Sequence, residues 1–127
     1  MKFAQRVFLI AGIYGIVVVA PLYFLEGFYG AQNPPAINHP EFYYGMVGIG
    51  LAWQVAFVIM SRDPVRYRPL MIPSVMEKFS YAGAMFVLLA MHRVSATSAA
   101  TGLIDFALGV LFIWAYVMTG RLPPTDR

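Results

Sequence analysis

Few side chains in this sequence could do chemistry, and most of them are expected at one end of the fold. Asp105 and Gln54 lie within long apolar stretches, whereas His39 and His92 lie where such stretches begin or end. Two neutral imidazoles that face each other can ligate haem or a metal ion. A carboxylate within an apolar segment can bind a proton or another ligand. The candidate ligand-binding residues are Asp105, His92, Arg93, Glu41, His39 and Gln54.

The histidines and Gln54 also have structural interpretations, which their positions favour. His39 lies in a region that starts a helix, and His92 lies in a last helical turn, where a cation suits the helix dipole. Neither has a second histidine at helical spacing. Gln54, in the middle of an apolar stretch, is expected to hydrogen-bond across helices. The sequence requires no metal or other cofactor.

Asp105 is the one acidic side chain firmly inside a predicted span. If its helix starts near residue 99, Asp105 lies roughly 9 Å below the outer end, at 1.5 Å per residue. A charge at the centre of a span costs about 2.5–3.5 kcal/mol, so a partner is expected. His92 or Arg93 could supply it, and Tyr43 or Tyr44 could donate a hydrogen bond. The carboxylate then either locks two helices together or binds a ligand.

Four apolar helices are predicted to position these side chains, at residues 6–25, 41–61, 75–92 and 99–119. Residues 26–40 are rich in Gly, Pro and Asn and are expected to form an exposed loop. Residues 61–69 carry three arginines and separate two helical hairpins. The predicted fold is therefore an all-α, four-helix transmembrane bundle that forms a single domain over residues 1–127.

Local signals predict some details of these helices. Pro21 is expected to loosen the last turn of the first helix. Ser74 and Glu77 have the spacing of a capping box, which places the start of the third helix near Val75 and leaves Glu77 and Lys78 in the headgroup layer. A stripe of small residues is predicted to be a helix contact face on the second helix. This small-residue stripe comprises Gly45, Gly48, Ala52 and Ala56.

Composition supports a membrane protein and excludes several functions. The 127 residues are 60% hydrophobic and only 12% charged, which is too apolar for one small soluble core. The nine basic residues form no stripe that would bind nucleic acid, and no nucleic-acid partner is expected. With no cysteine, the chain has neither disulfides nor thiolate metal sites nor thiol redox chemistry.

Basic residues predict the orientation of the four spans. Eight lie on the side of the termini and central loop, and only Arg93 lies opposite. The positive-inside rule therefore places both termini in the cytoplasm. Arg66 and Arg68 could also bind anionic lipid headgroups there. The residues on the basic side are Lys2, Arg6, Arg62, Arg66, Arg68, Lys78, Arg121 and Arg127.

Two stretches carry a resemblance to a known class of proteins. Residues 63–81 (DPVRYRPLMIPSVMEKFSY) and 102–112 (GLIDFALGVLF), within the four-span topology, resemble small uncharacterised bacterial integral membrane proteins of a broadly DoxX-like type. The resemblance implies a multi-pass protein of the bacterial inner (cytoplasmic) membrane without an assigned activity. It carries over no functional residues.

Two classes of function remain open from the sequence. The first, which we favour, is a non-catalytic accessory or assembly subunit that docks a membrane-protein partner or a second copy of itself in the lipid bilayer. The second is a membrane protein that binds a small molecule, an ion, haem or a metal through an outer-side site around Asp105, His92 and His39.

Overall fold

The computed structural model describes residues 2–122, and its regular structure is helical throughout this range. The prediction of an all-α protein is confirmed. Arg127 and the rest of the C-terminal tail lie outside the described residues. The α-helices are α1 (Lys2–Val19), α2 (Glu26–Gln32), α3 (Pro40–Arg62), α4 (Met71–Ala90) and α5 (Ala96–Gly120), and the short 3-10 helices are η1 (Ala20–Phe24) and η2 (Arg68–Leu70).

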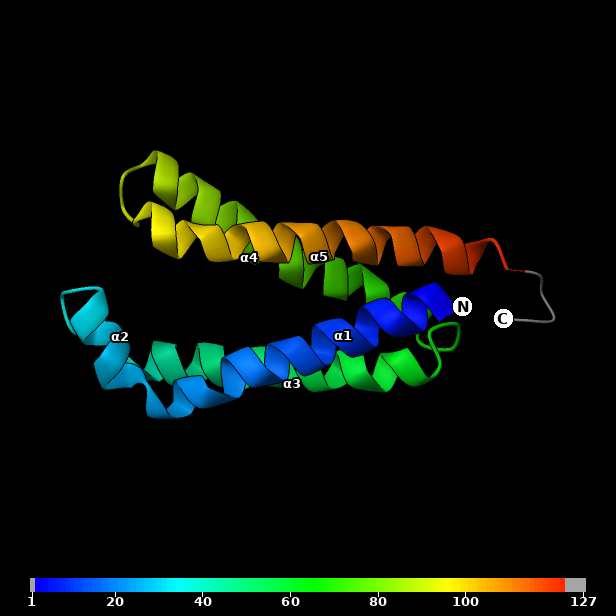
Figure 1. Ribbon diagram of the computed structural model, residues 1–127, viewed down its shortest axis with the longest axis horizontal. Helices are drawn as coiled ribbons and strands as arrows, with labels where there is room; N and C mark the ends of the chain where they lie inside the picture. Colours follow the sequence, from blue (N-terminus) through cyan, green and yellow to red (C-terminus); the bar gives the residue numbers. More distant parts are fainter. Residues whose placement is uncertain (1, 123–127) are drawn as a thin grey trace.

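The four long helices pack as two antiparallel pairs, α1 with α3 and α4 with α5 (Figure 1). We call the end where α1 and α4 begin and α3 and α5 end the proximal end, and the opposite end the distal end. The pairs meet towards the proximal end, where α1 contacts α5, and their ribbons separate towards the distal end (Figure 1). At the distal end, the Ser98 hydroxyl donates a hydrogen bond to Asn33 Oδ1 at 3.3 Å.

Three helical segments are long and apolar enough to cross a membrane: Lys2–Phe24, Pro40–Arg62 and Ala96–Gly120. Helix α4 is not among them, because Glu77 and Lys78 lower its mean hydropathy. Large apolar side chains also cover the outside of the long helices, and Ile10, for example, is 64% exposed. Soluble monomers rarely expose continuous apolar faces of this kind. The helices therefore indicate a membrane protein.

The segment after the first helix is more regular than the sequence predicts. Helix α1 changes into the 3-10 helix η1 next to Pro21, as the loosened last turn predicts. The following residues were expected to form an exposed loop, but Glu26–Gln32 forms helix α2. Buried Gly30 lies against Ala36, where an added Cβ would be 3.2 Å from the Ala36 Cα. The loop therefore folds back onto the short helix.

Helix α4 begins at Met71, so the predicted start near Val75 is wrong. Pro73 lies in the first turn, where backbone amides have no intrahelical acceptor and proline costs little. Ser74 does not cap the helix: it is buried and donates to the carbonyl of Leu70 at 2.6 Å. Because the helix starts earlier than predicted, Glu77 and Lys78 lie about two turns after its first residue, away from the helix end.

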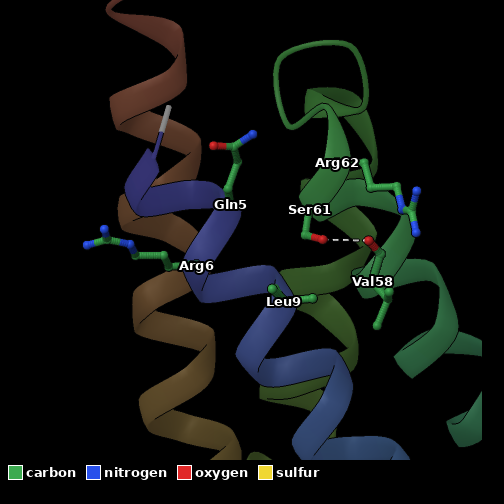
Figure 2. Close-up of a pocket in the computed structure, with 6 residues that line it drawn as sticks. All are labelled: Gln5, Arg6, Leu9, Val58, Ser61 and Arg62. Atoms are coloured by element: carbon green, nitrogen blue, oxygen red, sulfur yellow. Dashed lines mark hydrogen bonds between the residues drawn. The ribbon is translucent and has the colours of Figure 1, made fainter.

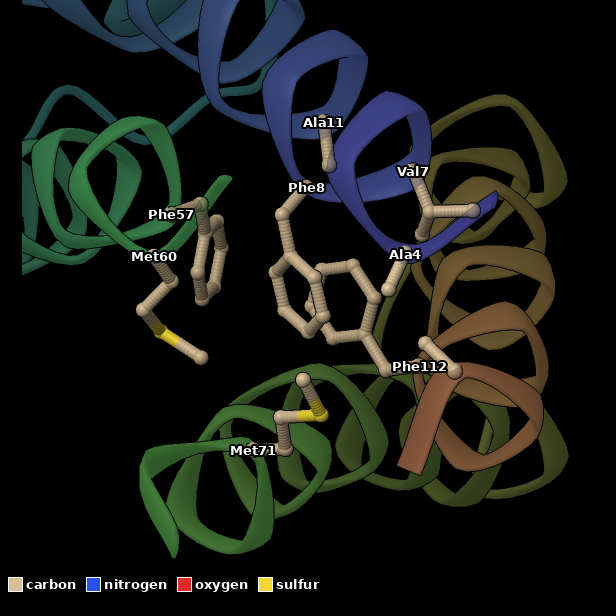
Figure 3. Packing of buried hydrophobic residues seen from close by; sticks show 9 residues of the cluster. Ala4, Val7, Phe8, Ala11, Phe57, Met60, Met71 and Phe112 are labelled. Atoms are coloured by element: carbon tan, nitrogen blue, oxygen red, sulfur yellow. The ribbon is translucent and has the colours of Figure 1, made fainter. Parts of the chain in front are cut away.

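The hydrophobic core joins the two helix pairs at the proximal half (Figure 3). Three phenylalanine rings form its centre, with the Phe8 and Phe112 centroids 4.4 Å apart and the Phe57 and Phe112 centroids 5.0 Å apart. Aromatic pairs at such separations add about 0.5–1.5 kcal/mol beyond the burial of their area. The buried cluster comprises Ala4, Val7, Phe8, Ala11, Phe57, Met60, Met71, Phe112 and Ala115.

Arg68 ties the central loop to the end of α5. Its Nε donates to the carbonyl of Tyr116 at 3.1 Å and to the hydroxyl of Thr119 at 3.2 Å. Its guanidinium also lies 3.8 Å from the centre of the Tyr116 ring. A cation near the last carbonyls of a helix is favoured by the helix dipole. Arg68 thus stabilises the fold by holding the central loop against α5.

The small-residue stripe of α3, which was predicted to be a helix contact face, is covered only in part by the described chain: a Cβ added at Gly48 would lie 3.1 Å from the Tyr23 hydroxyl of η1. Gly45 and Ala52 are exposed, and a Cβ added at Gly45 would meet nothing within 4 Å. The close contact is made instead by buried Gly12 of α1, where a Cβ would lie 2.8 Å from the carbonyl oxygen of Gln54. A spacing of three or four residues between glycines and alanines does not by itself show which of them face the neighbouring helix.

Replacing Gly12 with Ala should destabilise the protein by about 1–3 kcal/mol, because the added methyl group overlaps the backbone of α3. The matched variant Gly45→Ala adds the same methyl group to open space and should be neutral or stabilising by up to about 1 kcal/mol through helix propensity. Chemical unfolding of the detergent-solubilised protein measures both. Equal effects would contradict the packing of α1 on α3.

Candidate functional site

Three charged side chains form an ion cluster between α4 and α5. The Lys78 ammonium of α4 lies 3.7 Å from Asp105 Oδ1 of α5 and 3.5 Å from Glu77 Oε2. The Lys78 side chain is only 5% exposed, and those of Asp105 and Glu77 are 18% and 23% exposed. We call these three residues the ion cluster. It is a partly enclosed site in which one ammonium faces two carboxylates.

Phe57 covers the ion cluster from the other helix pair. The Lys78 Nζ lies 5.2 Å from the centre of the Phe57 ring, within the range of a cation–π interaction. Phe57 also belongs to the hydrophobic core, so the apolar centre and the ion cluster adjoin. Exclusion of water by the core strengthens the attraction between the charged groups. The ammonium therefore contacts three of the four long helices, counting its own.

The local sequence explains why Lys78 points inwards. Met71, Ser74, Lys78 and Ala82 are the buried residues of α4, and their spacing of three or four places them on one face. On α5, Asp105 lies between two buried glycines. Added Cβ atoms at Gly102 and Gly109 would lie 3.0 Å from Met85 and 2.8 Å from Phe79. The glycines thus let the two helices approach closely around the ion pair.

Along the helix axes, the ion cluster lies well away from the first residues of α4 and α5. Lys78 is seven residues after the start of α4, or roughly 10 Å along the axis, and Asp105 is nine residues after the start of α5, or roughly 14 Å. Lys78 was expected to extend into the headgroup layer, but its side chain is buried within the protein, because Lys78 shares a face with the other buried residues of α4. The spacing of Lys78 from Ser74 and Ala82 was the signal that sequence reasoning missed.

Asp105 has a buried partner, as expected, but the predicted partners are wrong. The Tyr43 hydroxyl donates to the carbonyl of Leu22 at 2.6 Å, and the Tyr44 hydroxyl donates to Glu26 Oε2 at 2.9 Å. Both tyrosines therefore hold the segment after α1 against α3. The ion pair with Lys78 locks the last two long helices together, which agrees with the structural interpretation of Asp105.

The histidines lie apart from the ion cluster. His39 Nδ1 lies 3.3 Å from Glu41 Oε1, and both side chains are about two-thirds exposed, at 65% and 64%. His92 is exposed, has a φ of 57°, and follows the end of α4. The backbone amide of His92 donates to Leu89, and that of Arg93 donates to Leu88, which is the Schellman arrangement that ends a helix.

Histidine is one of the residues that adopt this left-handed conformation more often than most, so His92 has a backbone role. Arg93 is exposed in the same turn. The predicted outer-side site therefore separates into three parts: a His39–Glu41 pair, an exposed turn with His92 and Arg93, and Asp105 in the ion cluster. No described hydrogen bond or ion pair within residues 2–122 joins these parts.

Gln54 is buried, with 3% exposure, but does not make the expected bond to another helix. Its Nε2 donates to the carbonyl of Gly50 in its own helix at 3.1 Å, and its Oε1 has no hydrogen-bond partner among the described residues. Gly15 of α1 provides the space for this side chain, since any Cβ there would overlap it. Gln54 thus fills the contact between α1 and α3.

Within residues 2–122, no group of three or more His, Cys, Asp or Glu side chains could hold a metal ion. Comparisons with protein-family models, with curated proteins and with solved structures found no match to this chain.

Replacing Lys78 with Met should cost about 3–5 kcal/mol of stability, because it leaves two partly buried carboxylates without their counter-ion. Asp105→Asn should cost less, since Glu77 still faces the ammonium. The double variant should be more stable than the sum of the two losses predicts, because the residues are in contact. Unfolding in detergent measures this cycle.

Arg93→Gln, in the exposed distal turn, is the control and should change stability by no more than about 0.5 kcal/mol. Strictly additive effects of Lys78→Met and Asp105→Asn would show that the two side chains do not interact.

Proposed function

We propose that this chain is a four-span protein of the bacterial inner membrane with both termini in the cytoplasm. Three segments already have the length and hydropathy of spans. The fourth, α4, is 20 residues long and turns its ammonium inwards, so its charge is screened from lipid. A 20-residue helix is about 30 Å long, which matches the hydrocarbon thickness of a bilayer. The resemblance to DoxX-like proteins points to the same membrane.

The distribution of basic side chains supports the proposed orientation. Arg93 alone of the described basic residues lies at the distal end, and Lys78 is internal. By the positive-inside rule, the proximal end faces the cytoplasm. The basic residues at that end are Lys2, Arg6, Arg62, Arg66, Arg68 and Arg121.

Cysteine labelling tests the topology without background, because the chain has no cysteine. A cysteine at Gln32, in the distal α2, should react with a membrane-impermeant thiol reagent in intact cells. One at Val65, in the proximal loop, should react only after permeabilisation. The reverse pattern would overturn the orientation, and labelling of both in intact cells would argue against a membrane-inserted bundle.

Within this membrane, we propose that the protein acts as a non-catalytic accessory or assembly subunit that docks a partner helix. The observation that carries the proposal is the exposed part of the small-residue stripe, Gly45 and Ala52, which its own helices leave uncovered. Lipid gives helices no hydrophobic drive to associate, so close backbone approach at small residues supplies the packing energy. Gly48, in contrast, lies under Tyr23 of η1.

Replacing Ala52 with Leu should release the partner, because the larger side chain holds the backbones apart. Ala107→Leu is the matched control, since Ala107 is also an exposed alanine and lies on α5. Purification in a mild detergent followed by native mass measurement should show a larger complex for the wild type and Ala107→Leu only. A lone monomer, or equal behaviour of the two variants, would contradict the docking proposal, and a complex of identical copies would replace the partner with a homo-oligomer.

A second candidate function is proton or monovalent-cation binding at the ion cluster. Two carboxylates share one ammonium, which leaves one negative charge in excess within the cluster. The Glu77 Oε2 atom is also buried without a hydrogen-bond partner in the described chain. A proton or a small cation would neutralise this excess. Intramembrane ionisable groups of this kind are default candidates for ion pathways.

Flux measurements on reconstituted vesicles distinguish this candidate from a structural ion pair. An ion pathway should conduct protons or sodium ions in the wild type and lose that flux in a folded Asp105→Asn variant. Arg93→Gln, which removes a charge outside the cluster, should leave the flux unchanged. Wild-type vesicles no leakier than protein-free ones would exclude the pathway and leave the cluster with its structural role.

A further inference from the structure

Hydroxyl side chains lie along the α4–α5 pair on the distal side of the ion cluster. On α5, Ser98, Thr101 and Asp105 are spaced by three and four residues, so they lie on one face of the helix. Thr101 is five residues after the start of α5, or roughly 8 Å along the axis, and Asp105 is one turn further. Tyr81 of α4, three residues after Lys78, adds a hydroxyl from the opposite helix. We call Ser98, Thr101 and Tyr81 the hydroxyl stripe.

Hydrogen bonds connect the members of the hydroxyl stripe. The Thr101 hydroxyl donates to the carbonyl of Ser98 at 2.7 Å, and its oxygen also lies 2.7 Å from the hydroxyl of Tyr81. Because the Thr101 proton is already donated, Tyr81 is the donor in the second bond. The Ser98 hydroxyl donates in turn to Asn33 Oδ1. Ordered hydroxyl groups therefore extend from the distal end to within one helical turn of Asp105.

The ion cluster can be reached from this stripe through its carboxylates. Thr101 is exposed, and the side chains of Asp105 and Glu77 are partly exposed, whereas that of Lys78 is nearly enclosed. The step from Thr101 to Asp105 is roughly 6 Å along the axis, which water can bridge with hydrogen bonds of about 2.8 Å each. A polar route from the distal end thus stops at the carboxylates.

Apolar packing closes the proximal side of the ion cluster. Ser74 lies one turn from Lys78 on the same face, but it is fully buried and its hydroxyl lies 3.7 Å from the sulfur of Met60. Met71, almost one turn beyond Ser74, is also fully buried. Phe57 covers the ammonium from α3. Interiors packed in this way leave no room for water, so the distal route does not continue to the proximal end.

A groove at the proximal end does not provide a second entrance (Figure 2). It lies between the start of α1 and the end of α3, and its lining shares no residue with the hydrophobic core. Figure 2 shows Arg6 and Arg62 extending away from the space between these helices. The groove therefore lies on a different face of α1 and α3 from the core and does not lead to the ion cluster. Its lining residues are Gln5, Arg6, Leu9, Val58, Ser61 and Arg62.

We propose that the ion cluster takes up protons or small monovalent cations from the distal side only, along the hydroxyl stripe. The carboxylate oxygens of Asp105 and Glu77 receive the proton or cation, and the excess negative charge of the cluster attracts cations into the route. The ammonium of Lys78 stays shielded from water because the route ends at the carboxylates. This inference rests on the second candidate function, binding at the ion cluster, and adds the side and the path of access.

The reactivity of introduced cysteines tests the route in the full chain, in intact cells and in inverted membrane vesicles. Thr101→Cys should react with a cationic, membrane-impermeant methanethiosulfonate added to the side on which Gln32→Cys reacts. Leu103→Cys is the matched control, because Leu103 is exposed on the same helix, two residues further along. Thr101→Cys should react roughly tenfold faster, since only the thiolate reacts and lipid keeps a thiol protonated. Equal rates would overturn the hydroxyl stripe as a water-accessible route.

Ser74→Cys tests the closure of the proximal side, and the substitution is close in size to the native side chain. It should not react from either side, because Ser74 is fully buried. Reaction from the side on which Val65→Cys reacts would overturn access from the distal side only.

The charge of the reagent tests whether the ion cluster attracts cations into the route. Thr101→Cys should prefer the cationic reagent to its anionic analogue by roughly tenfold more than Gln32→Cys does, as one uncompensated charge nearby requires. Adding Asp105→Asn makes the cluster neutral and should abolish this difference. An unchanged preference would overturn uptake of cations by the cluster.

A measurement on the wild type makes the test independent of the folding of the cysteine variants. In bilayers with ¹³C-aspartate, magnetisation from water should reach the carboxyl carbon of Asp105 nearly as fast as that of Asp63 in the proximal loop. A much slower transfer would overturn the route. If the route is found but vesicles show no ion flux, the flux pathway fails and the one-sided binding site stands, so the two failures are distinguishable.

Discussion

Burial of the Lys78 ammonium between apolar helices is the constraint on which much of this structure depends. A charge taken out of water loses several kcal/mol of solvation, and only close counter-ions recover it. Asp105 supplies one from the neighbouring helix, which fixes the rotation and the axial register of α5 against α4. The buried glycines of α5 follow from the same constraint, because a wider spacing would separate the two charges.

The ion cluster and the hydrophobic core support each other through Phe57. This ring belongs to the core that joins the two helix pairs, and it also lies beside the ammonium of Lys78. The pairs are thus connected mainly near the proximal end, where Arg68 also holds the central loop against α5. Towards the distal end the connection rests on contacts such as the bond between Ser98 and Asn33. We expect the distal end to be the more adaptable part of the fold.

Most of the polar residues contact other parts of the same chain and stabilise the fold. The small residues that the chain leaves exposed can instead contact other molecules. Tyr43, Tyr44 and His92 hold backbone or neighbouring side chains, so they are explained by the fold. The uncovered part of the small-residue stripe is not explained in this way. It lies on α3, and the proposed docking of a partner would use this helix.

The sequence was sufficient to predict the long helices and the class of fold, because hydropathy and helix-end signals are local. The start of α3 at Pro40 and the change of α1 near Pro21 followed from such signals. The partner of Asp105 could not be predicted in the same way, because it depends on which face of α4 is buried. That face became apparent only with the earlier start of α4 and the shared spacing of Ser74, Lys78 and Ala82.

What covers the small-residue stripe could not be predicted from the sequence for a related reason. Glycine and alanine at helical spacing occur both on α3, where Gly45 and Ala52 are exposed, and on α1 and α5, where Gly12 and Gly109 contact a neighbouring helix. Spacing identifies a face but does not say whether the same chain or another one covers it. The resemblance to DoxX-like proteins likewise remains a prediction.

The most direct test of this account is a solid-state NMR measurement of the Lys78–Asp105 contact in lipid bilayers. The chain has only two lysines, so a Lys2→Arg variant labelled with ¹⁵N-lysine reports on Lys78 alone. With ¹³C-aspartate as a second label, the account predicts a cross-peak between the Lys78 ammonium nitrogen and the Asp105 carboxyl carbon. This cross-peak should be lost in the Asp105→Asn variant. The account also predicts that the ammonium protons of Lys78 exchange slowly with water. A rapidly exchanging ammonium without that cross-peak would show that Lys78 lies at the membrane surface, and would contradict the packing of α4 on α5 described above.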